Sequence, residues 1–452
     1  HEVITMVRDM TKGSPMKLIL GFSIPLLFGM LFQQFYNLVD TMIVGKTLGV
    51  EALAGVGATG SINFMIIGFC MGVCGGFAIP IAQQFGAGRY SELRKYVYNS
   101  YILSIVFSIV LTILSVVFTQ SILRLMKTPD NIFWHSYNYI VIIFAGIPTV
   151  FLYNIVSSII RALGDSKTPV IFLVLSAVMN IFLDIWFITG LKMGVAGAAW
   201  ATDISQFVSG LLCLIYMNKK YDVLKFQKGE KQIHRQHAIN LIVNGVPMGL
   251  QYSITAIGSV ILQTSVNTLG SVSVAAMTAG SKLQMFFACP FDALGSTMAT
   301  YGGQNAGAKE VDRIGAGIRA AVIVGSVYSI AALVVQYLFG SYIALLFVDA
   351  SETQVIAMTH TFLIVNALFF IPLALVNIIR FCIQGMGFAG FAVLAGVFEM
   401  AARTVVAFTL VPVFRFNGAC MANPCAWVAA DIFLIPAFIY CSRRLKKRFG
   451  IG

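Results

Sequence analysis

Long apolar segments separated by short polar breaks run along the whole chain. A helix needs about 20 apolar residues to cross the hydrocarbon core of a bilayer, and several of these segments are longer, so we expect tilted or bent helices. The pattern predicts an all-α integral membrane protein with twelve transmembrane helices. The segments lie near residues 16–46, 53–85, 95–122, 134–160, 169–190, 195–217, 239–268, 273–301, 315–346, 355–383, 389–411 and 418–441.

Composition agrees with this pattern and excludes a soluble protein. Of the 452 residues, 58% are hydrophobic and 11% are charged, and the mean hydropathy is +0.86. A soluble chain of this length needs more charge to cover its surface. Prolines inside the apolar segments favour kinks. They are Pro25, Pro80, Pro148, Pro247, Pro290 and Pro372.

The net charge of +12 is distributed unevenly between the connections. Basic residues cluster in alternate connections, including 219–235 and the run Arg443–Arg448, whereas the intervening connections carry few. This asymmetry is typical of loops on the cytoplasmic side. We therefore expect a multi-pass protein of the bacterial cytoplasmic (inner) membrane with both termini in the cytoplasm. Membrane lipids, and not nucleic acid, are the expected partner of the basic tail.

No motif of an enzyme or of ATP hydrolysis is present in the sequence. The eight cysteines lie mostly inside apolar segments and form no CxxC pair, which argues against a zinc site or a disulfide framework. A phosphate-binding loop, Gly-x-Ser-x-Gly and His-Glu-x-x-His are all missing. We predict a protein that is not an enzyme and that needs no organic cofactor.

The second half of the sequence repeats the first at an offset of about 220 residues. Two bundles of six spans each, related by an axis along the membrane normal, would enclose a central cavity suited to alternating access. We predict an N-terminal lobe at 1–217, a cytoplasmic linker at 218–237 and a C-terminal lobe at 238–452. The matching segments are Gln84–Arg89 with Gln304–Lys309, Leu48–Gly49 with Leu269–Gly270, and Gly197–Ala201 with Gly418–Ala422.

Charged residues within the spans are few, and two aspartates fall at the same predicted depth. Asp40 lies in the outer part of the first span and Asp184 in the outer part of the fifth. Asn180 precedes Asp184 by one helical turn, and Thr202 lies at a similar level in the sixth span. Two carboxyl groups in one layer could share a proton, or with the amide and hydroxyl oxygens could bind Na⁺ as a metal ligand set. Simple hydrogen bonding between helices is the structural alternative.

Other polar residues of the spans are weaker candidates for a substrate cavity. Asp292 could attract a cationic substrate, whereas packing is the default interpretation for Tyr139 and Met285 and a structural role is favoured for Asp203. Glu399 and Arg403 are four residues apart, which predicts a structural ion pair. The tentative cavity set is Gln34, Asn37, Tyr139, Asn154, Asp203, Gln251, Met285 and Asp292.

Several separated motifs resemble the multidrug and toxic compound extrusion (MATE) transporters. The resemblance covers nearly the whole chain and implies two six-helix lobes and cation-coupled efflux of amphipathic, often cationic, compounds. Asp40, Asn180, Asp184 and Thr202 match cation-site positions of the DinF-type branch. The motifs are Gln34–Gly49, Gln84–Gly88, Arg161–Pro169, Asn180–Asp184, Gly197–Thr202 and Gln304–Gly307.

The NorM-type branch of that family also uses acids on helices 7 and 10. This chain has Gln251, Ser253 and Thr255 in the seventh span, and Asn366 and Asn377 in the tenth. The departure argues against a cation site in the second lobe.

The hypothesis is therefore a monomeric secondary transporter that exports small organic compounds while H⁺ or Na⁺ enters. A flippase for lipid-linked saccharides is the alternative, although the extra helices or charged cavity expected for a pyrophosphate head are not evident. The third possibility is a receptor or a channel that is not a transporter.

Overall fold

The computed structural model describes residues 7–451, which fold into helices with no strand among them. These residues form two compact units. Unit 1 consists of residues 7–9 and Phe28–Tyr252, and unit 2 of Met10–Leu27 and residues 253–451.

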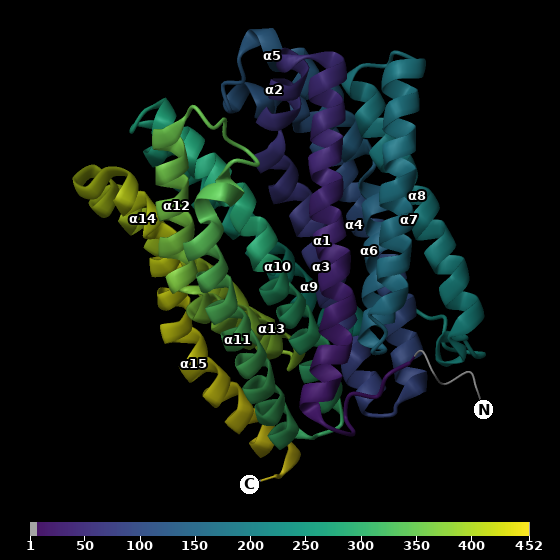
Figure 1. Cartoon of the computed structure of the whole chain (residues 1–452). Helices are drawn as coiled ribbons and strands as arrows, with labels where there is room; N and C mark the ends of the chain where they lie inside the picture. The colour runs from purple at the N-terminus through teal and green to yellow at the C-terminus, as the bar shows by residue number, and fades with distance from the viewer. Residues whose placement is uncertain (1–6, 452) are drawn as a thin grey trace. The chain divides into compact units, whose positions relative to one another are not determined.

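Unit 1 is a bundle built from the second part of α1 through the first part of α9. Within it α3 packs on α6, α6 on α8 and α7 on α8, and the helices run side by side from purple to teal in Figure 1. Its helices are α1 (Pro15–Leu48), α2 (Val50–Ala58), α3 (Gly60–Gly86), α4 (Tyr90–Leu125), α5 (Asp130–Ala145), α6 (Ile147–Ala162), α7 (Lys167–Ile185), the π-helical turn η2 (Trp186–Gly190), α8 (Val195–Lys220), the 3₁₀ turn η3 (Asp222–Leu224) and α9 (Arg235–Asn267).

Unit 2 is the corresponding bundle from the second half of the sequence. Its main contacts join α10 to α13 and α14 to α15, in the green to yellow part of Figure 1. In addition to parts of α1 and α9 it contains α10 (Ser271–Gly307), α11 (Val311–Ala344), α12 (Thr353–Leu368), α13 (Phe370–Gly385), α14 (Ala389–Cys420) and α15 (Ala422–Phe449).

The helices account for the predicted membrane crossings. In the described residues, nine helices are long and apolar enough to span a bilayer, and two bent pairs, α5 with α6 and α12 with α13, add two more. Among the described helices of at least 18 residues, only α10 is too polar to meet the same criterion. With α10 included, these elements correspond to the twelve apolar segments of the sequence.

Two predicted spans are broken next to prolines, at matching places in the two units. The helix pair α5–α6 bends by 48° at Gly146, two residues before Pro148. The pair α12–α13 bends by 53° at Phe369, three residues before Pro372. The first turn of a helix tolerates proline, because the N–H that proline lacks would have no hydrogen-bond partner within the helix there. Each of these prolines accordingly lies in the first turn of the second helix of its pair.

The internal repeat is also visible in the backbone. Left-handed φ values recur at an offset of 221 residues, with Gly49 (φ 90°) matching Gly270 (φ 101°). Likewise Gly194 (φ 67°, ψ −148°) at the start of α8 matches Arg415 (φ 51°, ψ −127°) in α14. Since only glycine adopts such angles freely, Arg415 holds a strained conformation that its counterpart holds without strain.

The boundary between the two units passes through the first helix of each half. The first part of α1 belongs to unit 2 and the rest to unit 1, with the change after Leu27, two residues beyond Pro25. The first part of α9, up to Tyr252, belongs to unit 1 and the rest to unit 2. The units and the predicted lobes therefore differ in two segments. Residues 10–27 belong to the predicted N-terminal lobe (1–217) but lie in unit 2, and residues 238–252 belong to the predicted C-terminal lobe (238–452) but lie in unit 1. That functional division stays a prediction.

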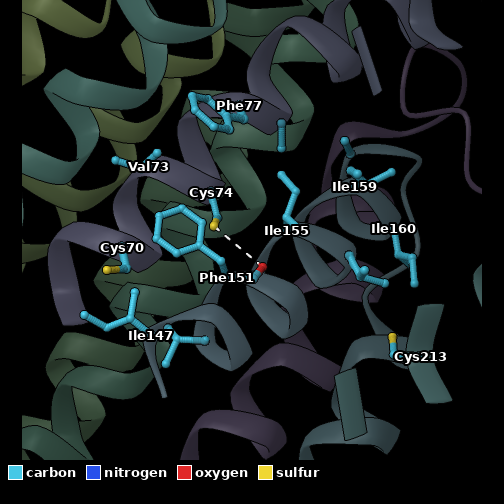
Figure 2. Packing of buried hydrophobic residues seen from close by; sticks show 14 of the residues in the cluster. Cys70, Val73, Cys74, Phe77, Ile147, Phe151, Ile155, Ile159, Ile160 and Cys213 are labelled. Atoms are coloured by element: carbon cyan, nitrogen blue, oxygen red, sulfur yellow. Dashed lines mark hydrogen bonds between the residues drawn. The ribbon is translucent and has the colours of Figure 1, made fainter. Parts of the chain in front are cut away.

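Buried side chains of α3 and α6 form the core of unit 1. Figure 2 shows Cys74 and Phe77 of α3 facing Phe151 and Ile155 of α6, and each of the four is at most 3% exposed. The Cys74 thiol lies 4.0 Å from the backbone oxygen of Phe151, which is a weak contact. Cys74 thus serves as a small apolar side chain in the core of unit 1.

Two arginines hold the chain segments that lead into the first helices of the two halves. In unit 1, Arg94 of α4 donates to both carboxylate oxygens of Glu230, at 2.7 and 2.8 Å, and to the backbone oxygen of Val223. These charged hydrogen bonds lower the pKa of Glu230 to about 2. In unit 2, Arg313 of α11 donates to the backbone oxygens of Met10 and Gly13. The two contacts occupy similar places, but only that of Arg94 is an ion pair.

Candidate cation site

Three helices of unit 1 bring the four predicted cation-site residues together. Asp40 comes from α1, Asn180 and Asp184 from α7, and Thr202 from α8. Asp184 is fully buried and Asn180 is 3% exposed, while Asp40 and Thr202 are half-buried. Counting residues along helices of alternating direction predicted one common layer for these four residues, and in the fold they lie together.

The two carboxyl groups interact directly. Asp40 and Asp184 lie close enough for a side-chain hydrogen bond, and such a bond would need a proton on one of the two groups because carboxylate oxygens only accept. The Oδ1 atom of Asp40 is buried and has no hydrogen-bond partner. A buried acceptor without a partner is costly, so this atom is a place where a proton or a cation would be stabilised.

The amide of Asn180 connects Asp184 to the other two helices. Its nitrogen donates to Asp184 Oδ2 at 2.9 Å, and its oxygen accepts from Tyr36 and from Thr202 Oγ1, the latter at 3.1 Å. This orientation gives both polar atoms of the amide partners of the right kind, whereas the reverse would turn the amide oxygen toward the carboxyl oxygens of Asp184.

An apolar layer lies one helical turn away from the polar layer on all three helices. Val44 follows Asp40 by four residues, Ile188 follows Asp184 by four, and Ala198 precedes Thr202 by four. Val44, Ile188 and Ala198 are all at most 2% exposed and pack in one cluster together with Tyr139. The cluster gives the site an apolar boundary on the side toward the end of α1 and the start of α8.

The site offers two carboxyl groups, one amide and one hydroxyl to a proton or to a sodium ion. Within residues 7–451, no three His, Cys, Asp or Glu side chains gather into a metal-binding group. Sodium would have to be held by oxygens of Asp40, Asp184, Asn180 and Thr202. The amide orientation that gives Asn180 a donor bond to Asp184 points nitrogen, not oxygen, at that place.

The other predicted residues of unit 1 lie around the site in different settings. Tyr139 interacts electrostatically with Asp40, Asp184 and Asp203. Asp203 is 6% exposed, and its carboxyl covers Gly146, where an added Cβ would lie 2.1 Å from Oδ1. It therefore lies at the N-terminus of α6, where the helix dipole favours a negative charge.

The remaining predicted cavity residues of unit 1 show no common grouping. Gln251 is 6% exposed, and Asn154 donates to the backbone of its own helix, at Val150. Gln34 is half-buried and Asn37 is exposed. Their assignment to a substrate cavity stays a prediction.

One residue of this site was missed in the predicted set. Tyr36 hydrogen-bonds Asn180 and also interacts with Thr202. It precedes Asp40 by four residues in α1, so the helical period places it on the same face.

In unit 2, Asp292 and the expected Glu399–Arg403 pair lie near a charged residue, Arg380, that was not predicted. Met285 is 52% exposed, and Asp292 is exposed and accepts from Asn377 Nδ2 at 3.3 Å. The expected Glu399–Arg403 pair is present at 3.4 Å, but Glu399 also pairs more closely with Arg380. Arg380 itself lies in an apolar segment, where any charge is a signal.

The fold and these residues match known membrane transporters. The family model described as MatE matches residues 25–186 and 247–409. A probable multidrug resistance protein, YoeA of Bacillus subtilis, is 32% identical over 343 residues, 74% of each chain. Another, YpnP of the same organism, is 30% identical over 378 residues, 82% of each chain.

A solved structure shares the fold over almost the whole length. It is described as the outward-facing conformation of a multidrug resistance MATE family transporter of the MOP superfamily, with TM-score 0.89 and 23% identity. The match covers 97% of this chain and 98% of that one, which confirms the predicted twelve-helix membrane fold. With the family model matching both halves, the chain belongs to the MatE family, whose members are multi-pass membrane transporters and not enzymes.

Proposed function

We propose that the protein is a secondary active transporter that exports small organic compounds in exchange for an ion bound at Asp40 and Asp184. The proposal rests above all on one observation, the close approach of these two carboxyl groups in a buried layer of unit 1. The names of the relatives YoeA and YpnP, both probable multidrug resistance proteins, support export of varied compounds.

The proton is the coupling ion that the site favours. Neutral hydrogen-bonding groups surround the carboxyl pair, so the pair can hold one proton between two oxygens at a low cost of desolvation. Loss of that proton leaves two adjacent negative charges, which repel each other. The Asn180 amide nitrogen, which donates to Asp184, would then compensate part of this charge.

The charge of the pair can act on the backbone through α1. Asp40 lies on the same helix as Pro25, and the two units divide this helix beside the proline. A proline leaves a backbone oxygen without its helical partner and eases bending. Protonation that changes how α1 packs on α7 and α8 would therefore favour one of two access states, as alternating access requires.

The proposed location and partners are inferred from the charge pattern and from the sequence, which carries no enzyme or ATP-hydrolysis motif. The basic connections support a location in a bacterial inner membrane with both termini on the cytoplasmic side, and residues 1–6 and 452 lie outside the described part of the chain. The protein works as a monomer, with no cofactor other than the coupling ion, and its partners are organic substrates and membrane lipids, not nucleic acid.

The test is transport by purified protein in lipid vesicles under imposed pH or Na⁺ gradients, with a cationic dye as substrate. Wild-type protein should accumulate dye when a proton gradient is applied. Asp40→Asn should abolish this gradient-driven transport, because the carboxyl pair can no longer take up and release a proton. Dye binding to the folded variant should persist.

The matched control is Glu51→Gln, which removes one exposed acid at the start of α2 in the same unit. It should transport like the wild type. Undiminished gradient-driven transport by Asp40→Asn would overturn the assignment of the site. Transport driven by Na⁺ and not by H⁺ would keep the site but change the ion.

A further inference from the structure

Two histidines lie next to each other where α9 begins. His234 and His237 form a His-x-x-His sequence, and their ring centres are 5.1 Å apart with the ring planes inclined by 48°. Residues three apart at the start of a helix can share one face. Both belong to unit 1, at the end of the basic connection that joins α8 to α9. The pair is separate from the candidate cation site, whose residues come from α1, α7 and α8.

Each of these histidines has one buried ring nitrogen that lacks a hydrogen-bond partner among the described residues. The two atoms are Nε2 of His234 and Nδ1 of His237. A buried polar atom without a partner costs free energy, so each such atom needs an explanation. A bound ion that accepts the nitrogen lone pairs would remove the cost at both atoms at once.

Glu92 of α4 determines which nitrogen of His237 is available. Its Oε2 atom lies 2.9 Å from Nε2 of His237, and its Oε1 atom accepts from Lys95 Nζ at 2.8 Å. A carboxylate only accepts hydrogen bonds, so Nε2 carries the proton and Nδ1 of the neutral ring keeps a lone pair. Metal-bound histidines commonly donate their second N–H to a carboxylate in this way. Glu92 thus leaves Nδ1 as a possible metal ligand.

Residues of α4 also hold the two histidines in place. Asn99, which is 1% exposed, accepts from the backbone nitrogen of His234 at 3.1 Å and donates to the backbone oxygen of Gln232 at 3.0 Å. The ring of Tyr96 packs edge-on against that of His237, with the ring centres 4.4 Å apart. Side chains that are already fixed lose little entropy when they bind an ion.

The spacing and the ligand type suit a divalent transition metal. Metal–nitrogen bonds of about 2.0–2.1 Å place the centres of two imidazole rings on one ion about 5 Å apart, close to the separation of 5.1 Å in this structure. Neutral imidazole binds zinc, copper and nickel, whereas magnesium prefers oxygen ligands. Within residues 7–451 no third His, Cys, Asp or Glu completes a metal-binding group, so water would fill the remaining positions.

We propose that His234 and His237 bind a divalent transition-metal ion such as Zn²⁺, and that Glu92 is the positioning residue for His237. The ion would link the start of α9 to the segment before it, both of which contact α4. The proposal goes beyond the proposed ion exchange and shares no residue with it.

Calorimetric titration of Zn²⁺ into purified, tag-free protein in detergent tests the site. Wild-type protein should bind one Zn²⁺ per chain and show no binding of Mg²⁺. His234→Gln and His237→Gln should each weaken Zn²⁺ binding at least about tenfold, because one ligand alone remains. The matched control is His135→Gln, which removes a half-buried histidine of α5 in the same unit and should bind like the wild type.

Glu92 is tested by a pair of substitutions. Glu92→Ala should weaken Zn²⁺ binding about tenfold, the cost typical of losing a carboxylate behind a metal-bound histidine. Glu92→Gln should restore most of the affinity, since its amide oxygen can accept from Nε2 of His237. A merely structural role of the Glu92–Lys95 ion pair would not be repaired by a neutral side chain.

Melting temperatures give a second readout that also detects misfolded variants. Zn²⁺ should raise the melting temperature of the wild type and of His135→Gln, because an ion that binds only the folded state stabilises it. It should leave His234→Gln and His237→Gln unchanged, although both melt cooperatively without metal.

Wild-type protein that binds no Zn²⁺ would overturn the inference, as would equal affinity of the wild type and both histidine variants. Binding of Mg²⁺ as tight as that of Zn²⁺ would also overturn it, since it would indicate attraction to carboxylates and not ligation by imidazole. None of these results touches the proposed function, which depends on gradient-driven transport and on Asp40.

Discussion

Both units bury acidic side chains in equivalent bundles, but they surround them differently. In unit 1, Asp40 and Asp184 face each other, a tyrosine and an amide. In unit 2, Glu399 lies between two arginines. A carboxyl group with neutral neighbours can gain and lose a proton, whereas one held between fixed positive charges stays ionised and stabilises the fold. The same scaffold therefore holds two carboxyl groups among neutral partners in one unit and a carboxylate between two arginines in the other.

Neutralising one acid in each unit should separate these roles most clearly. Glu399→Gln leaves two buried guanidinium groups without their carboxylate and should lower the free energy of unfolding by about 3–5 kcal/mol. Asp184→Asn removes a carboxyl that already needs a proton to be buried, so stability should change by less than about 1 kcal/mol. Thermal unfolding of the two purified variants measures the difference.

The matching functional readout is gradient-driven transport, which Asp184→Asn should lose. A Glu399→Gln protein as stable as the wild type would contradict the structural role of the unit 2 pair. Equal destabilisation by the two substitutions would remove the distinction between the units.

The layer shared by Asp40 and Asp184 could be predicted from the sequence because depth in a membrane follows from counting residues along helices of known direction. The ion pair of Glu399 with Arg380 could not, since it joins α14 to α13 and depends on how these helices are rotated about their axes. Periodicity fixes which residues share a face of one helix, but not which face meets its neighbour. For the same reason the electrostatic interactions of Arg380 with Asp431 of α15 and with Asp292 of α10 were not foreseen.

The helix breaks at Gly146 and Phe369 were partly predictable. Pro148 and Pro372 indicated kinks, and the structure places each in the first turn of a new helix. The contact of Asp203 with Gly146 was not foreseeable, because it requires the close approach of α8 to the bend.

Lowering the pH should weaken the ion pair of Arg94 with Glu230, which holds the segment before α9. It should leave the hydrogen bonds of Arg313 to backbone oxygens in unit 2 unchanged. The pKa of Glu230 is lowered to about 2 in the folded protein, and an unfolded glutamate titrates near 4.3. The stabilisation is therefore complete above about pH 4.5 and is lost as the pH falls toward 2, by about 2 kcal/mol. Arg313 binds neutral oxygens and adds no such dependence.

Unfolding of wild type and Glu230→Gln between pH 6 and pH 2.5 measures this effect. The curves should differ at pH 6 and converge in acid, whereas Glu310→Gln, an exposed acid before α11, should follow the wild type. Parallel curves for wild type and Glu230→Gln would show that the ion pair contributes nothing.

The smallest effect concerns the strained position of the repeat. Arg415→Gly should stabilise the protein by about 1 kcal/mol, because glycine adopts φ 51°, ψ −127° without the steric cost that arginine meets. The reciprocal change Gly194→Ala at the matching position of unit 1 should destabilise by a similar amount. Melting temperatures of the two variants test the pair, and Arg415→Lys, which keeps the strain, should not gain stability.

The division of α1 and α9 between the units has a consequence for the architecture of the repeat. Each half of the sequence gives the start of its first helix to the unit built mainly from the other half. Reciprocal exchange of an identical element is domain swapping, which normally joins two copies of one chain into a dimer. Here the same kind of exchange takes place within one polypeptide, whose two halves are joined by the connection between α8 and α9.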